Sequence, residues 1–184
     1  MSWLLSFVFA GTVANGPAAA PIESASLVHP GVVRSAGELL GSESRRIRSS
    51  ERRINKLLED GVRRSRSFAD LVSKIHRTNV IVYIETSHTL EPETVGRILL
   101  QTVAGGQRYL RVQVRGLLQG DMVIAIIAHE LHHALEVADD VSVVDDATLT
   151  ELYKRIGHTS HGAKGFDTDA AKAAGFRVRD ELIG

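Results

Sequence analysis

The sequence contains no cysteine, and this absence removes three kinds of chemistry at once. The chain can form no disulfide, offers no thiolate to a metal ion and has no cysteine nucleophile. Any metal ion must therefore be held by His, Asp or Glu side chains. The chain also lacks an excess of charge of one sign, because 22 Lys and Arg balance 22 Asp and Glu. With no net charge there is no general attraction for nucleic acid, and we expect no nucleic acid among the partners.

Long apolar runs are equally scarce. Residues 3–14 form an apolar run that is too short to span a bilayer comfortably. Small, turn-forming residues follow at 15–21, a pattern typical of a signal peptide, although Met1 and Ser2 carry no positive side chain. We therefore interpret residues 1–20 as a signal peptide, which implies a periplasmic or secreted protein. The alternative is an N-terminal membrane anchor, and no membrane span is expected in the mature domain.

The chain as a whole has the composition of a globular protein, with 43% apolar and 24% charged residues among 184. Residues 21–44 are rich in Pro, Gly and small polar residues and are predicted to be a linker. Residues 45–184 are predicted to form one domain. Nothing in the sequence specifies an oligomeric state.

The segment from Arg45 to His76 carries apolar residues at helical spacing and many arginines. Gly61 and residues 65–67 are expected to divide it into two helices, with Ser67 as the N-cap of the second. The basic side chains have two interpretations: a patch that binds an anionic surface or a nucleic acid, or the solvated face of a helix. We favour the solvated face, because acidic residues are interleaved with the basic ones.

The second half of the chain predicts an α+β fold. Tyr109–Arg115 alternates polar and apolar residues, as in a strand with one buried face. A helix follows, for which Asp121 is a plausible N-cap. We expect a short twisted sheet, this central helix and two C-terminal helices. The other predicted strands are Val80–Ile84 and Gly96–Val103, and the C-terminal helices are Asp146–Ile156 and Thr168–Leu182.

The helix after Asp121 contains the motif His129-Glu130-Leu131-His132-His133. His129 and His133 stand at i and i+4, so their imidazoles lie on one face, one turn apart. Two such imidazoles can converge on Zn²⁺, which in catalytic sites keeps one coordination position open. Glu130 is adjacent to the first ligand and suits the role of a general base acting on a metal-bound water. The alternative is a pair of core histidines that binds no metal.

The strand Tyr109–Arg115, the turn after it and the motif helix resemble the core of the zincin metallopeptidases. The helix is also similar to that of small uncharacterised bacterial zincin-like proteins. The resemblance implies a minimal zincin-like domain that hydrolyses peptide bonds with zinc and with Glu130 as the general base. It also implies that Tyr109–Arg115 is an edge strand along which an extended polypeptide substrate binds.

The third zinc ligand has four candidates. Phe166-Asp167-Thr168-Asp169-Ala170 resembles the gluzincin segment that supplies the third ligand, with Asp167 in the place of Glu. Glu136, seven residues after His129, is better placed to bind the imidazole of His133 than to bind zinc. Glu151 is possible by its distance along the chain, whereas Asp139 should rotate off the ligand face if the helix continues. We rank Asp167 first, then Glu136, Glu151 and Asp139.

Other polar residues near the motif carry weaker predictions. Tyr153, His158 or His161 could donate a hydrogen bond to an oxyanion, although solvent-facing positions are the simpler expectation. His132 is expected beside the site or partly exposed. The rival to a peptidase is a catalytically inactive module that binds zinc or a peptide, for regulation or structure.

Overall fold

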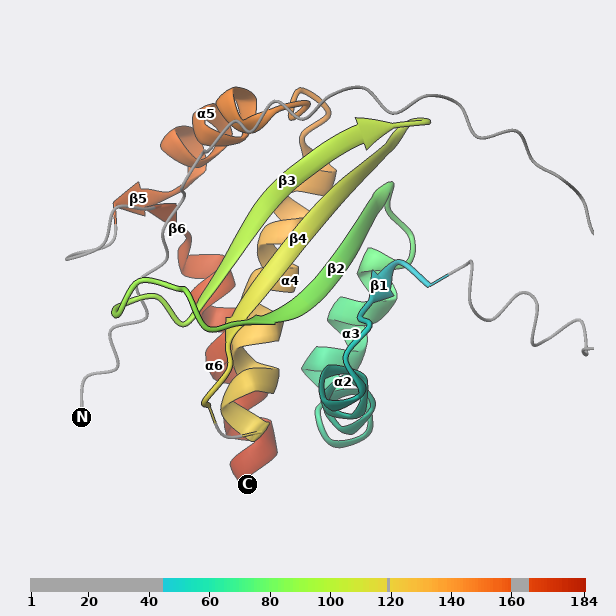
Figure 1. The fold of residues 1–184 in the computed structure, drawn as a ribbon, viewed down its shortest axis with the longest axis vertical. Helices are drawn as coiled ribbons and strands as arrows, with labels where there is room; N and C mark the ends of the chain where they lie inside the picture. Colours follow the sequence, from blue (N-terminus) through green and yellow to red (C-terminus); the bar gives the residue numbers. More distant parts are fainter. Residues whose placement is uncertain (1–44, 119, 160–165) are drawn as a thin grey trace, which may run out of the picture. The chain divides into compact units, whose positions relative to one another are not determined.

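A computed structural model describes residues 45–118, 120–159 and 166–184. The predictions for residues 1–44 and for His161 lie outside this range. The described part contains both helices and a mixed sheet, so the predicted α+β class is confirmed (Figure 1). In chain order the elements are β1 (Ile47–Arg48), α2 (Arg52–Arg64), α3 (Arg66–Ile75), β2 (Val80–Ser87), β3 (Gly96–Ala104), β4 (Gln107–Arg115), α4 (Gly120–Asp139), α5 (Asp146–Ile156), β5 (His158–Thr159), β6 (Phe166–Asp167) and α6 (Asp169–Ile183).

The main sheet has the strand order β1-β2-β4-β3. Strand β4 runs parallel to β2 and antiparallel to β3, and it is hydrogen-bonded on both sides along its length. The prediction that Tyr109–Arg115 is an edge strand is therefore wrong, because its backbone groups already have partners in β2 and β3. The antiparallel edge strand is β3, which was predicted as a strand but not as the edge.

Strand β4 shows the predicted alternation: Arg108, Leu110, Val112 and Val114 are buried and the residues between them are half-buried. The apolar residues of this face pack against α4, whose side chains from Val123 to Leu131 are all buried. Figure 1 shows α3, α4 and α6 behind the sheet. Because α4 has the sheet on one side and α3 and α6 nearby, it is apolar around nearly its whole circumference in its first half.

The C-terminal end of α4 is held by a buried arginine. Arg108 is 3% exposed, and its guanidinium donates to the carbonyl oxygens of Val137, Ala138 and Asp140, and to Oδ1 of Asn79. These bonds satisfy carbonyl groups that have no partner within the helix. Burial lowers the pKa of Arg108. The position of α4, and with it the motif, is thus fixed relative to β4.

The helix boundaries confirm most predictions and correct two caps. Helix α3 is capped by Ser65, whose hydroxyl accepts from the amide of Phe68, whereas Ser67 instead donates to Glu181 on α6. Helix α4 begins at Gly120, so Asp121 lies inside the first turn, where it forms an ion pair with Arg64. The two C-terminal helices lie where they were predicted, as α5 and α6.

The basic segment lies on exposed helix surface, as favoured. Several of its arginines have partners: Arg63 pairs with Asp60, and Arg53 donates to the carbonyl oxygens of Gly116 and Leu118. Among the helices of the described part, none has the length and apolar character needed to cross a membrane.

Candidate metal centre

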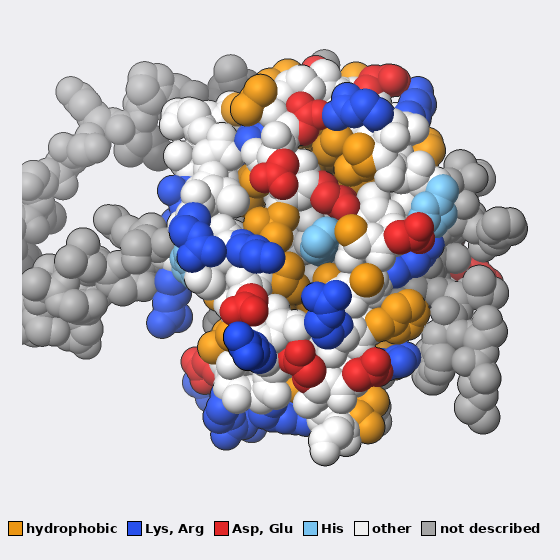
Figure 2. All heavy atoms as spheres, turned by 180° about the vertical axis from the view of Figure 1, so that it is seen from behind, with side chains coloured by type: hydrophobic (Ala, Val, Ile, Leu, Met, Phe, Trp, Pro, Cys, Tyr) orange, Lys and Arg blue, Asp and Glu red, His pale blue; other side chains and the backbone are white. Residues whose placement is uncertain are grey.

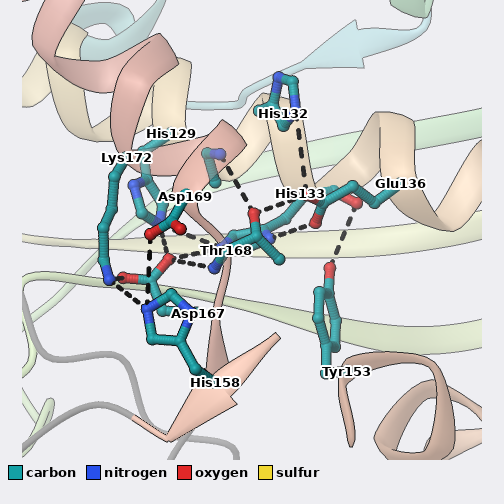
Figure 3. Close-up of polar contacts among 11 residues, drawn as sticks. His129, His132, His133, Glu136, Tyr153, His158, Asp167, Thr168, Asp169 and Lys172 are labelled. Atoms are coloured by element: carbon teal, nitrogen blue, oxygen red, sulfur yellow. Dashed lines mark hydrogen bonds and ion pairs between the residues drawn. The ribbon is translucent and has the colours of Figure 1, made fainter. Parts of the chain in front are cut away.

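Three buried side chains meet at one point of the structure. His129 and His133 on α4 direct their Nε2 atoms toward each other at 3.0 Å. Oδ1 of Asp167, from β6, lies 3.3 Å from Nε2 of His129 and 3.6 Å from Nε2 of His133. Figure 3 shows the carboxylate of Asp167 beside the two rings. This group of two imidazoles and one carboxylate can hold a metal ion.

Asp167 is positioned at the site by a short antiparallel pair of strands, β5 and β6. His158 of β5 pairs with Asp167 of β6, and Thr168 then caps α6 by accepting from the amide of Ala171. Asp167 therefore lies just before a helix and not within one, unlike the gluzincin ligand that it resembles. Its Oδ1 also accepts from the amide of Thr168 at 2.7 Å, which fixes the orientation of the carboxylate.

Glu136 contacts His133 and Thr168 next to the three candidate ligands. Its Oε2 lies 2.7 Å from Nδ1 of His133, and its Oε1 accepts from the hydroxyl of Thr168 at 2.6 Å. It therefore binds the far side of the His133 ring, as the spacing indicated. The remaining candidates are not at the site: Glu151 is exposed and paired with Lys154, and Asp139 is exposed at the end of α4.

Burial and the neighbouring carboxylates shift the pKa values of His129 and His133 in opposite directions. Burial lowers the pKa of His129 to about 4. Burial also acts to lower the pKa of His133, but hydrogen bonds to Asp167 and Glu136 outweigh it and raise the pKa to about 9. Without a metal ion the pair thus favours a single positive charge, carried by the His133 ring between the carboxylates of Asp167 and Glu136, while His129 stays neutral. The pKa of Asp167 falls well below its ordinary value because the bonds to the two imidazoles outweigh its burial.

Glu130 lies on the same helix but outside this hydrogen-bonded group. It is fully buried, and within the described residues neither carboxylate oxygen has a hydrogen-bond partner. Gly96, the first residue of β3, lies directly over it. Burial raises the pKa of Glu130 to about 8, so that the protonated form is present at neutral pH when no metal is bound.

Two further side chains border the site. The Tyr153 ring is buried edge-on against His133, with centroids 5.1 Å apart, and its hydroxyl donates to the carbonyl oxygen of His133 at 3.3 Å. It is thus neither solvent-facing nor directed at open space. Nζ of Lys172 lies 3.6 Å from Oδ2 of Asp167 and 2.5 Å from Nε2 of the exposed His158 (Figure 3). Sequence reasoning missed Lys172, whose only signal is its place one turn into the helix after Asp167.

His132 lies beside this group, as expected. It is half-buried, and its Nε2 lies 3.8 Å from Oε1 of Glu136.

Comparison of the chain with protein-family models, with curated proteins and with solved structures finds no match in any of the three. The chemistry of the site must therefore be argued from its own geometry.

Proposed function

We propose that His129, His133 and Asp167 bind zinc and that the protein is a zinc-dependent peptidase. The spacing of the three ligand atoms carries this proposal. Ligand atoms about 2.0–2.1 Å from a tetrahedral zinc ion lie roughly 3.3–3.4 Å from one another. The three separations here are 3.0, 3.3 and 3.6 Å. The two nitrogen donors also favour zinc over calcium or magnesium, which prefer oxygen ligands.

Three protein ligands leave one coordination position for water, which is the arrangement of catalytic rather than structural zinc sites. When bound, zinc lowers the pKa of that water and polarises a substrate carbonyl. Glu130 is the neighbour of the first ligand; burial raises its pKa to about 8 without metal, and the positive charge of a bound zinc ion would oppose this shift and favour the carboxylate form that a general base needs. In this proposal Glu130 accepts the proton of the water and returns it to the leaving amine.

The edge of β3 supports a polypeptide substrate. The carbonyl oxygen of Val95 accepts from the amide of Arg115 at 2.9 Å, so Val95 faces β4. Because hydrogen-bonding direction alternates along an antiparallel strand, the N–H and C=O of Gly96 face away from β4. No strand occupies that side within the described part of the chain. An extended substrate can therefore add to β3 beside Glu130, in place of the position first expected on Tyr109–Arg115.

The proposal is tested by pairing metal content with activity. Purified protein should contain about one zinc per chain by elemental analysis, and it should cleave unfolded casein or fluorogenic peptides. His133→Ala should lose both zinc and activity, whereas the adjacent His132→Ala should keep zinc. Glu130→Gln should keep zinc and lose activity. Failure of the wild-type protein to bind zinc, or full activity of Glu130→Gln, would overturn the proposal.

One observation favours a second candidate, a zinc- or peptide-binding module without catalysis. Glu130 is 0% exposed, and a general base must be reached by the water that it deprotonates. If the carboxylate stays beneath β3 when zinc is bound, the site would serve structure or regulation. Stoichiometric zinc together with no turnover on any peptide would support this candidate.

A further inference from the structure

A groove of about 240 Å³ lies on the helical face of the domain, between α3 and α6. The residues of α3 and of α6 that line the groove are three or four positions apart or adjacent, so each helix lines the groove with one of its faces. His132 of α4 is also part of the lining. Alanines make up most of the α6 wall and keep the groove open. The lining residues are Ser67, Asp70, Leu71, Lys74, His132, Ala170, Ala173, Ala174 and Arg177. Figure 2 shows this side of the molecule, where a histidine lies at the surface beside Lys and Arg side chains.

Two cations in this groove form no close ion pair. Lys74 and Arg177 lie in no ion pair within residues 45–118, 120–159 and 166–184, although Asp70 lies one helical turn from Lys74, and Arg177 is near enough to Glu181, one turn further along α6, to help lower the pKa of that carboxyl. The two walls run antiparallel, because Ser67 near the start of α3 binds Glu181 near the end of α6. Burial lowers the pKa of His132, and Glu136 acts to raise it. Lys74 and Arg177 are both near enough to His132 to lower its pKa further, as His133 also does.

We propose that this groove binds a small molecule carrying a tetrahedral oxyanion, of the phosphate or sulfate type. The anion would lie over His132 and receive the ammonium of Lys74 and the guanidinium of Arg177 from opposite walls. Such an anion offers several acceptor oxygens, which suits donors that arrive from three different helices. Leu71 on the α3 wall and the alanines on the α6 wall provide apolar surface for the organic part of the ligand. This inference is independent of the peptidase proposal, since none of the three candidate zinc ligands lines the groove.

The site can be tested with inorganic phosphate on the full chain in the presence of a chelator, so that phosphate cannot bind through zinc. Amide chemical shifts around Ser67–Lys74 and Ala170–Arg177 should change saturably on titration. We expect Lys74→Gln and Arg177→Gln each to weaken binding about tenfold, because each removes a charged hydrogen bond. Sulfate should compete with phosphate, whereas acetate should compete poorly.

Two exposed cations on α2 provide matched controls for net charge. Lys56→Gln and Arg63→Gln change the charge by the same amount outside the groove and should leave phosphate affinity nearly unchanged. Equal weakening in the control and groove variants would mean diffuse attraction to the helical surface and would overturn the proposal. Linear, non-saturating shifts, or acetate binding as strong as that of phosphate, would also overturn it.

Discussion

A Cβ atom at Gly96 would lie 2.7 Å from Oε1 of Glu130 and 2.6 Å from Cγ2 of Ile126. Strand β3 can therefore pass this close to α4 only because Gly96 has no side chain. We predict that Gly96→Ala displaces Glu130 or lifts the start of β3, at an overpacking cost of about 1–3 kcal/mol. The variant should bind zinc normally, because Gly96 touches no proposed ligand, but peptide hydrolysis should fall sharply.

The control for this variant is Gly120→Ala, at the start of α4. Among the residues that the structure describes, an added Cβ there meets only the flexible end of Leu57, at 3.3 Å. Zinc content and the kinetic constants of both variants distinguish the two positions. If Gly96→Ala retained full activity, the tight contact with Glu130 would have no role in catalysis.

Glu136 should control metal affinity without binding the metal. Its bond to Nδ1 of His133 fixes the ring so that Nε2 faces His129 and Asp167. We expect Glu136→Gln to weaken zinc binding by about 10–100-fold, as is usual for loss of a hydrogen-bond partner of a liganding histidine. Competition with a calibrated chelator measures this change. Glu151→Gln, at an exposed acid on α5, should leave the affinity unchanged, and an equal loss there would contradict the assignment.

The buried Glu130 should make the stability of the metal-free protein depend on pH. Its pKa is about 8 in the folded chain and 4.5 ordinarily, so folded and unfolded states bind the proton equally below pH 4.5. Between these values the unfolded state loses the proton while the folded state keeps it. Stability therefore falls as pH rises, by a total on the order of 3–5 kcal/mol above the folded pKa.

Glu130→Gln removes this ionisation and should avoid the loss. With a chelator present, urea denaturation should show the variant more stable than wild type at about pH 8.5, with a much smaller difference at about pH 5. A difference that does not change with pH would show that Glu130 ionises freely in the folded protein.

Arg108 should be a principal contributor to stability. Replacement by Met fills much of the same volume but leaves the carbonyl oxygens of Val137, Ala138 and Asp140 without their donor. Buried acceptors left unpaired cost about 1–3 kcal/mol each, so Arg108→Met should lose several kcal/mol in chemical denaturation. Arg111 lies on the opposite, outward face of β4; its side chain is 43% exposed and its Nη1 lies 3.8 Å from Oε1 of Glu85, so Arg111→Met should cost under about 1 kcal/mol.

The motif and the strands were predictable because each depends on local spacing. The i, i+4 relation of His129 and His133 follows from the helical repeat, and the alternation in Tyr109–Arg115 follows from the strand repeat. The place of β4 inside the sheet was not predictable, since strand order depends on which neighbours pair with it. A half-buried alternating strand looks the same in sequence whether it is central or at an edge.

The caps and the third ligand show the same limit. Ser65 and Ser67 are equally good N-caps by residue type, and the competing bond from Ser67 to Glu181 on α6 is a tertiary contact. Asp167 was ranked first only through its resemblance to a helical ligand. Strands β5 and β6, which bring Asp167 to His129 and His133, have two residues each and are too short to have a recognisable sequence pattern.

Asp167 reaches the two histidines from a distant part of the chain, after α5 has intervened. A metal ion held by all three side chains would therefore be a cross-link between α4 and the start of α6. Removing the metal ion would break this cross-link between His133 and Asp167. The gain in conformational entropy would then favour local opening of the intervening segment, which contains α5. Sensitivity of this segment to proteolytic nicking would then report metal occupancy, even in a variant that has lost all turnover.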